Sequence, residues 1–221
     1  MTENARSALR SVADRLAAIA LDHPLRVAVD GITAAGKTTF ADSLAVELRS
    51  RDREVVRISV DGFHNPRAVR YQQGRASADG YYEDAYDFVA LRGYVLDPLG
   101  PGSTFEYRSA ILDLATDQPS KDSFHRADPH SIVIIDGSFL QREEIRPSWD
   151  VVIFLRTSFE AAERRGVERD ALQLGGEATA RTAFRDRYHA AQRRYLTEVD
   201  PERCADLVVD VEDPAAPRLV R

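Results

Sequence analysis

The sequence predicts an α/β fold, a doubly wound sheet of about five parallel strands flanked by helices. Short apolar runs alternate with amphipathic helical patterns along the 221 residues. Two of these runs, 131–136 and 150–156, are continuously apolar, as in strands buried on both faces of a parallel sheet. A third run, 25–30, leads directly into a glycine-rich turn and a helix, which is a βα unit. The length and the 43% hydrophobic content suit a single domain over 1–221.

The other elements follow from periodicity and end signals. Leu9, Val12, Leu16 and Ile19 lie three or four residues apart, so an amphipathic helix is expected near the N-terminus. An acidic first turn and Pro98 bound a helix in the middle of the chain, and alternating residues suggest a small hairpin after it. The expected helices are 4–20, 84–97, 158–171 and 178–199, the further strands are 54–61 and 206–210, and the hairpin lies within 103–117.

Composition narrows the function. The formal net charge is -6, so no overall positive field favours nucleic acid or a membrane surface, and no run of 18 apolar residues suggests a membrane span. The single cysteine, Cys204, cannot form an internal disulfide or a multi-thiolate metal site, which favours a reducing compartment. We therefore expect a cytoplasmic protein that acts on a small-molecule substrate, without a nucleic acid or membrane partner; a homodimer or other homo-oligomer stays open.

The strongest motif is the phosphate-binding loop. Residues 31–38, GITAAGKT, fit the pattern G-x-x-x-x-G-K-[ST] between a strand and a helix. Lys37 is one of only two lysines in the chain, and a glycine-rich turn without a ligand would not need it. Its ammonium is expected to reach the β- and γ-phosphates of ATP, with the Thr38 hydroxyl on Mg²⁺. The predicted ATP-binding residues of this loop are Gly31, Thr33, Ala34, Ala35, Gly36, Lys37, Thr38 and Thr39.

Two aspartates end strands that follow the loop. Asp61 and Asp136 are each followed by glycine, and the carboxyl ends of parallel strands face the ligand crevice. One carboxylate near a triphosphate can hold Mg²⁺ directly or through water, and the other can accept the proton of an attacking hydroxyl. The alternative for each is a turn or cap aspartate. A P-loop alone does not separate kinases from GTPases, ATPases or motors.

Several blocks in one order make the chain similar to the uridine kinase, pantothenate kinase and phosphoribulokinase family. They are the P-loop, D-G-F-H at 61–64, D-A-Y-D-F at 84–88, I-D-G at 135–137 and R-R-G-V-E-R-D at 164–170. The resemblance runs from about residue 25 to 210. It implies a P-loop NTPase fold of the nucleoside and nucleotide kinase type, with a substrate-side insertion (about 62–120) and a small lid (about 160–180). In the single expected domain these follow the N-terminal helix segment (1–22) that the spacing predicts. The resemblance also implies ATP and Mg²⁺ as cofactors, and phosphoryl transfer to a hydroxyl of a small metabolite.

The resemblance assigns roles to matching residues. Asp61 matches the general base, while Lys37 and Thr38 match the phosphate and magnesium residues, with Asp136 as a further magnesium residue. Arg164, Arg165 and Arg169 match arginines of a lid helix that closes over the triphosphate. Arg165 and Arg169 would be catalytic there, Arg165 also binding ATP and Arg169 also facing the substrate. Each arginine could instead belong to a solvated helix face.

The chain departs from uridine kinases at the acceptor side. Uridine kinases usually carry glutamate at the position of Asp136, and the aspartate that grips the ribose is replaced here by Tyr81. The stretches around Asp61 and 80–87 look at least as much like pantothenate kinases. His64, Tyr81 and Tyr82 are the predicted substrate-binding residues beside Asp61 and Arg169; a satisfied turn histidine and core tyrosines are the alternatives.

The sequence thus favours an ATP- and Mg²⁺-dependent kinase that phosphorylates a hydroxyl, with uridine or cytidine as first candidate. Pantothenate or another small metabolite is the alternative acceptor. Two rivals come from other classes: a switch protein that hydrolyses nucleotide to change shape, and a paralogue that binds nucleotide without catalysis. Against them stand the missing guanine-reading N-K-x-D motif and the intact Lys37, Thr38 and Asp61.

Overall fold

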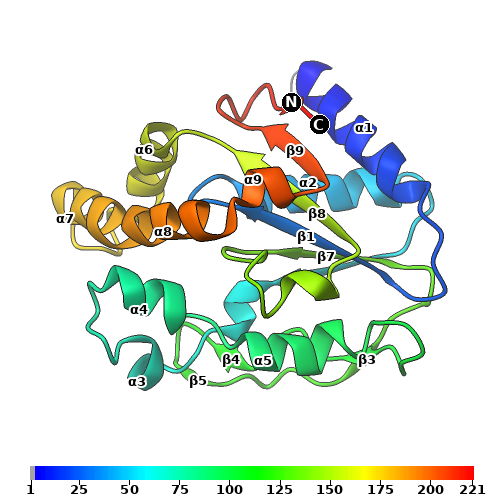
Figure 1. Cartoon of the computed structure of the whole chain (residues 1–221), viewed down its shortest axis with the longest axis horizontal. Helices are drawn as coiled ribbons and strands as arrows, with labels where there is room; N and C mark the ends of the chain where they lie inside the picture. The colour runs from blue at the N-terminus through cyan, green and yellow to red at the C-terminus, as the bar shows by residue number, and fades with distance from the viewer. Residues whose placement is uncertain (1–2) are drawn as a thin grey trace.

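The computed structural model describes residues 3–221 and has one central sheet. The strand order is β10-β9-β8-β1-β7-β2, and β2, β7, β1, β8 and β9 are mutually parallel (Figure 1). This confirms the five predicted parallel strands; the short antiparallel edge strand β10 was not predicted. The bounds are β1 Leu25–Gly31, β2 Val55–Ser59, β7 Ile132–Asp136, β8 Val151–Arg156, β9 Leu207–Asp210 and β10 Arg218–Leu219.

The central strand β1 explains why these segments form a parallel sheet. All of its residues are buried between β7 and β8, so an apolar run with no exposed face is what this position requires. Val29 pairs with Asp136 in the register of β1 and β7. The loop after β1 and the aspartate that ends β7 therefore meet at one edge of the sheet.

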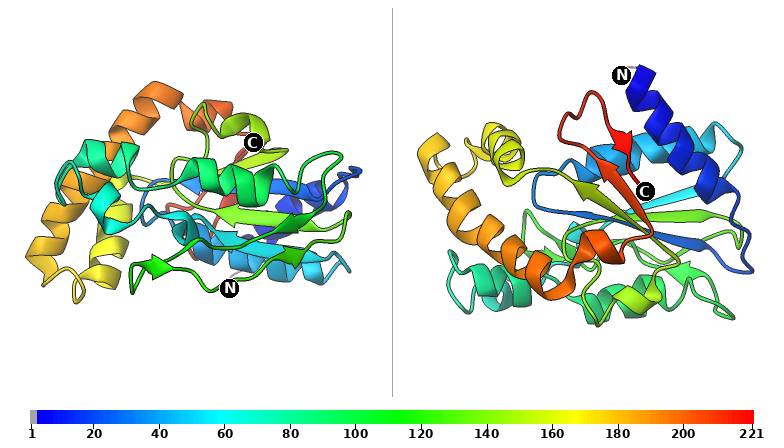
Figure 2. Two further views of the ribbon diagram at one scale, coloured as in Figure 1. Left: turned by 90° about the horizontal axis from the view of Figure 1, so that it is seen from below. Right: turned by 45° about the horizontal axis from the view of Figure 1, so that its top comes forward.

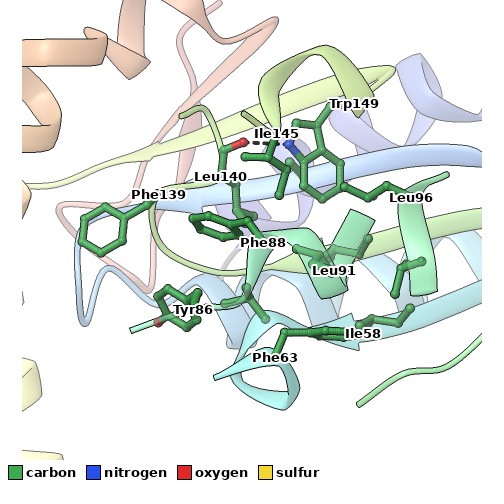
Figure 3. Packing of buried hydrophobic residues seen from close by; sticks show 14 of the residues in the cluster. Ile58, Phe63, Tyr86, Phe88, Leu91, Leu96, Phe139, Leu140, Ile145 and Trp149 are labelled. Atoms are coloured by element: carbon green, nitrogen blue, oxygen red, sulfur yellow. Dashed lines mark hydrogen bonds between the residues drawn. The ribbon is translucent and has the colours of Figure 1, made fainter. Parts of the chain in front are cut away.

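Helices cover both faces of the sheet (Figures 1 and 2). Val27 and Val29 point into one core, which α1 and α2 close, whereas Ala28 points into the other. The second core contains α5, part of α8 and the loop that carries Phe139 and Trp149; the Trp149 indole nitrogen donates to the Leu140 carbonyl at 2.7 Å (Figure 3). The helices and helical turns of this framework are α1 Glu3–Ala17, α2 Lys37–Arg49, α5 Phe88–Leu91, the π turn η2 Arg92–Leu96, the 3-10 turn η3 Arg146–Ser148, α8 His189–Val199 and α9 Pro201–Cys204.

The segment between β2 and β7 consists of short elements. The expected helix 84–97 begins only at Phe88, because Asp87 caps it by accepting from the Ala90 amide at 2.8 Å, while Tyr86 forms a bridge with His64. The expected hairpin within 103–117 is also wrong in its pairing, because β4 pairs with β5 and β3 pairs with β6 beyond that range. The elements are the 3-10 turn η1 Val60–Phe63, α3 Arg67–Arg70, α4 Ala78–Glu83, β3 Glu106–Tyr107, β4 Leu112–Asp113, β5 Gln118–Pro119 and β6 His125–Arg126.

A helical arm follows β8. It contains α6 Phe159–Asp170, α7 Glu177–Ala183 and the π turn η4 Phe184–Tyr188, which continues into α8. The predicted helix 178–199 is thus one helix with a π turn inside it. Gly166 allows α6 to pack closely against η4, because a Cβ at this position would come within 2.1 Å of the Phe184 ring.

Figure 1 shows α3 and α4 on one side of the left edge of the sheet and α6 to α8 on the other. Within residues 3–221, no helix has the length and apolar character needed to cross a membrane.

Candidate active site

A cleft of about 760 Å³ lies at the edge where β1, β2 and β7 end. The loop after β1, the turn after β2, the segment 64–86 and the arm residues 169–188 surround it. Its lining residues are Thr33, Ala34, Gly36, Lys37, Thr38, Thr39, Ser59, Asp61, His64, Arg67, Arg70, Tyr71, Arg75, Tyr81, Ala85, Tyr86, Leu114, Asp136, Gly137, Ser138, Arg169, Asp170, Gln173, Leu174, Arg187 and Tyr188.

The predicted P-loop forms one wall of the cleft. Gly36 has φ +93° and Ala34 φ +66°, so the loop turns through left-handed conformations before α2 begins at Lys37. Gly31 is needed for close approach, because a Cβ there would lie 2.9 Å from the Leu155 carbonyl oxygen of β8. Gly31 and Ala35 shape the loop without lining the cleft. The free amides of this 13-residue helix favour an anion at its N-terminus.

Lys37 bends back across the loop. Its Nζ donates to the Gly31 carbonyl at 3.0 Å and to the Ile32 carbonyl at 2.9 Å. Burial lowers the pKa of Lys37, and the charges of Asp30, Asp136 and Asp61 oppose that shift. The ammonium is therefore held by carbonyl oxygens of the loop, near enough to these three carboxylates to feel their charges.

Asp30 is a residue that the sequence analysis missed. It is fully buried and accepts from the Gly31 amide at 2.8 Å, the Gln141 amide at 3.0 Å and the Tyr195 hydroxyl at 2.6 Å. Burial raises the pKa of Asp30, and these hydrogen bonds oppose the shift. The carboxylate fastens the start of the loop to the core. Asp30 could have been singled out from the sequence, because it is a carboxylate in the otherwise largely apolar run 25–30.

Thr38 and Asp136 meet at the floor of the cleft. The Thr38 hydroxyl donates to Oδ2 of Asp136 at 2.6 Å, and Arg57 on β2 donates to Oδ1 at 2.8 Å. A hydroxyl and a carboxylate are the oxygen donors that Mg²⁺ prefers, and they stand beside the phosphate loop, so the pair fits the expected metal. Residues 3–221 contain no group of three or more His, Cys, Asp or Glu placed to bind a metal.

Asp61 lies on η1 and lines the same cleft as the P-loop. Its side chain is 63% exposed, and its backbone amide bonds to Ser59 Oγ at 3.3 Å. Nδ1 of His64 lies 3.1 Å from the Asp61 carbonyl oxygen and 3.8 Å from its carboxylate. Burial lowers the pKa of His64, whose ring packs on Tyr86 at 4.4 Å. Asp61 is thus an accessible carboxylate, and His64 supports its turn while lining the cleft.

The two predicted substrate tyrosines have different positions. Tyr81 lines the cleft, and its hydroxyl lies 3.2 Å from the Thr33 hydroxyl of the P-loop. Tyr82 does not line it; its ring packs edge-on against Phe139 at 5.1 Å, with Arg142 over its face. The Tyr81 ring also packs edge-on against Phe139, at 5.3 Å, so both tyrosines are buried in the core and only Tyr81 also reaches the cleft.

The two lid arginines also differ. Arg169 lines the cleft and is paired with its neighbour Asp170 at 2.7 Å. Arg165 does not line it, because its guanidinium donates to the carbonyls of Ala161 and Val211, each at 3.1 Å, and to the Thr157 hydroxyl. The structure thus brings Arg169 to the cleft and leaves Arg165 outside it.

Several charged and aromatic residues of the cleft were not predicted. For Arg67, Arg70, Tyr71 and Arg75 the available signal is the basic and aromatic content of the segment after His64, which has no helical or strand period. Arg57 and Arg187 reach the site from β2 and η4 and carry no such signal.

Comparisons with known proteins agree with this geometry. No model of a known protein family matches the chain. Over 158 residues, 71% of this chain, it is 25% identical to a chloroplastic uridine/cytidine kinase of Arabidopsis thaliana, and over 156 residues it is 25% identical to a uridine kinase of Lactobacillus helveticus, covering 72% of that protein. A solved structure described as a possible uridine kinase of Bacillus stearothermophilus superposes with a TM-score of 0.73 at 26% identity, covering 92% of this chain and 97% of that one.

In sequence and fold the chain is similar to uridine kinase-like P-loop kinases. It spans about a third of the Arabidopsis relative, 32% of its length. It spans nearly all of the solved bacterial structure. The predicted fold class and family resemblance are therefore confirmed.

Proposed function

We propose that the protein transfers the γ-phosphoryl group of ATP to a hydroxyl of a small metabolite. The observation that carries the proposal is the position of Asp61, an exposed carboxylate in the same cleft as Lys37 and the Thr38–Asp136 pair. Binding of nucleotide needs only the phosphate loop and its metal site. Transfer to a hydroxyl also needs a group that can accept the hydroxyl proton, and an exposed carboxylate in the same cleft can do so.

Each wall of the cleft has a part in this reaction. The P-loop amides and Lys37 bind the β- and γ-phosphates, and Thr38 with Asp136 would hold Mg²⁺. Mg²⁺ bound there would neutralise charge on the phosphate oxygens. Asp61 accepts the proton as the acceptor oxygen forms its bond to the γ-phosphorus and the bond to the ADP oxygen breaks. Arg169 supplies positive charge to the transferring group.

Nucleosides are the first acceptors to test, because the named relatives are uridine and uridine/cytidine kinases. A second candidate is an acidic metabolite such as pantothenate. Two features favour this acceptor. Tyr81 stands where uridine kinases carry a ribose-binding aspartate, and several arginines line the cleft. The single cysteine supports a reducing compartment such as the cytoplasm for either reaction.

The test is ADP release in a coupled assay with Mg²⁺-ATP and one acceptor at a time: uridine, cytidine, pantothenate and sugar phosphates. We expect release that depends on an acceptor and disappears in Lys37→Ala. Release at one rate with every acceptor and without any would instead identify a nucleotide-hydrolysing switch. No release at all from protein that binds ATP would indicate a nucleotide-binding paralogue without catalysis.

A further inference from the structure

Five arginines line the cleft, and their partners differ: Arg67, Arg70, Arg75, Arg169 and Arg187. Arg169 is neutralised by Asp170, and Arg67 and Arg70 share Asp117 at 3.9 and 3.4 Å. Within residues 3–221, neither Arg75 nor Arg187 has a carboxylate within ion-pair distance. The cleft thus contains cations that the protein itself does not neutralise.

Arg187 is held in a fixed position. It lies in the π turn η4, and its guanidinium packs over the rings of Tyr71, Tyr81 and Tyr188 at 5.4, 5.1 and 5.2 Å. Its Nε is buried and has no hydrogen-bond partner. A π turn shifts the residues after it around the helix and is frequent at functional sites. Such a turn here presents to the cleft a guanidinium with an unused donor.

Tyr71 is the centre of this group. The guanidinium groups of Arg70, Arg75 and Arg187 lie 5.1, 5.9 and 5.4 Å from its ring centre. Burial raises the pKa of Tyr71, but the hydrogen bond and charge of Arg70 and the charges of Arg187 and Arg75 outweigh it and leave the pKa below its ordinary value. We call these four residues the arginine cluster.

The arginine cluster is on the acceptor side of the cleft. After burial and the opposing contribution of Asp61, the charges of Arg70 and Arg187 help to lower the pKa of His64, which is three residues from Asp61. The charge of Arg169 acts on the P-loop Lys37 and adds to the lowering of its pKa by burial. Lys37 and Arg169 are therefore the cations we assign to the phosphates of ATP, and the arginine cluster, which surrounds Tyr71, is available to another anion.

We propose that the arginine cluster binds an anionic group of the acceptor, a carboxylate or a phosphate, and so directs the acceptor hydroxyl toward Asp61. The proposal rests on the proposed phosphotransfer function and narrows its acceptor to acidic metabolites. Planar guanidinium groups bind both anions through paired hydrogen bonds, and Arg187 still has donors to give. A neutral nucleoside would leave these cations without a countercharge in a partly buried site.

The experiment compares acceptors that differ in one anionic group. Binding is measured by calorimetry with the cleft loaded with Mg²⁺ and a non-hydrolysable ATP analogue. Ribose 5-phosphate is compared with ribose, and pantothenate with pantothenol, so that the two pairs distinguish a phosphate from a carboxylate. We expect the anionic member of one pair to bind at least tenfold more tightly than its neutral partner.

Substitution of individual arginines tests whether the arginine cluster is responsible for the tighter binding of the anion. Arg187→Gln and Arg75→Gln should each weaken binding of the preferred anion by about 10- to 100-fold and leave the neutral member unchanged. The matched control is Arg203→Gln, because Arg203 is 81% exposed and does not line the cleft. Arg75 is exposed, so its variant tests the site even where loss of Arg187 packing unfolds the arm.

The outcomes separate this proposal from the proposed function. Equal binding of both members in both pairs, or transfer to uridine with a KM unchanged in Arg75→Gln and Arg187→Gln, would overturn the arginine cluster as an acceptor site while leaving the kinase activity in place. Anion binding that depends on Arg75 and Arg187, without ADP release from any acceptor, would support the cluster and count against phosphotransfer.

Discussion

Arg57 on β2 forms an ion pair with Asp136 on β7 at 2.8 Å, beside the Thr38 hydroxyl that donates to the same carboxylate at 2.6 Å. The Asp136 side chain is only 3% exposed. Arg57 therefore provides the countercharge of a buried carboxylate, so the residue that we propose as a Mg²⁺ ligand also contributes to the stability of the sheet.

Arg57→Gln should lower the free energy of unfolding by about 3 kcal/mol, because it leaves a buried carboxylate without its partner. Urea unfolding measures the change. Arg10→Gln is the control, since Arg10 is 62% exposed and pairs with Glu47 at 3.8 Å, so its loss should cost less than about 1 kcal/mol. Equal decreases in the free energy of unfolding of the two variants would show that the buried Arg57–Asp136 pair stabilises the fold no more than an exposed pair does.

Asp136→Asn tests the metal role of the same pair. The amide keeps the shape and can still bond Thr38, but it removes the charge that attracts Mg²⁺. We expect the Mg²⁺ concentration for half-maximal ATP turnover to rise by about tenfold or more, with an unchanged far-ultraviolet circular dichroism spectrum. An unaltered Mg²⁺ dependence would place the metal elsewhere.

Lys37→Ala should weaken ATP binding by about 10- to 100-fold, because it removes the charge-assisted contact to the phosphates. The chain has a matched control in its only other lysine, Lys121, which is exposed and does not line the cleft. Calorimetric titration with the ATP analogue compares Lys37→Ala and Lys121→Ala with the wild type. A folded Lys37→Ala protein with wild-type affinity would remove the P-loop assignment.

The segment 160–180 should become ordered when nucleotide and acceptor bind. Gly175 and Gly176 have φ +86° and +111° and open space around them, as a hinge requires, and Leu172 between them and α6 is 94% exposed. Hydrogen exchange across this segment should slow with the ATP analogue. Equal protection in both states would favour a rigid helix ended by a glycine turn.

Substitution of the two predicted lid arginines should have different effects on kcat. Arg169→Ala should lower kcat by about 100-fold, because Arg169 faces the cleft and can exchange Asp170 for the transferring phosphate. Arg165→Ala should cost about 1 to 3 kcal/mol of stability and leave kcat unchanged, since its bonds run to Thr157 and Val211. A kcat loss in Arg165→Ala comparable to that in Arg169→Ala would contradict this division.

His189 makes stability depend on pH. Its ring is buried against Phe159 and Phe184 at 4.8 and 5.7 Å, and burial lowers its pKa to about 4 despite Glu163, with Arg193 and Arg185 acting in the same direction as burial. Below its ordinary pKa of about 6.5, the unfolded chain takes up a proton that the folded chain does not. The contribution of His189 to the free energy of unfolding is therefore fully present above pH 6.5 and is lost as the pH falls toward 4.

Between pH 7 and pH 5 this loss amounts to about 2 kcal/mol. His189→Gln should reduce the difference in urea unfolding between the two pH values by that amount. His130→Gln, at an exposed histidine before β7, should keep the wild-type difference. A wild-type pH difference in His189→Gln would assign the effect to other groups.

The sequence allowed the main sheet and the P-loop to be predicted because β1, β7 and β8 are continuous apolar runs and Gly36-Lys37 has a fixed place between strand and helix. The two small antiparallel pairs, β3 with β6 and β4 with β5, and the edge strand β10 were not predicted. Strands of two residues are too short to show an alternating pattern in the sequence. Arg57 belongs to the site only because β2 aligns with β7, which is a tertiary fact. Arg187 faces the cleft through a π turn, whose extra residue leaves no clear mark in the helical pattern.

Asp61, as we propose, enables phosphoryl transfer from ATP to an acceptor hydroxyl. The most direct measurement follows the label of γ-³²P-ATP, separating phosphorylated acceptor from free phosphate, in the wild type and in Asp61→Asn. We expect the wild type to place label on the acceptor, and Asp61→Asn to bind the ATP analogue normally but transfer about 100-fold more slowly. Label found only in free phosphate in the wild type, or near-native transfer by Asp61→Asn, would contradict the account.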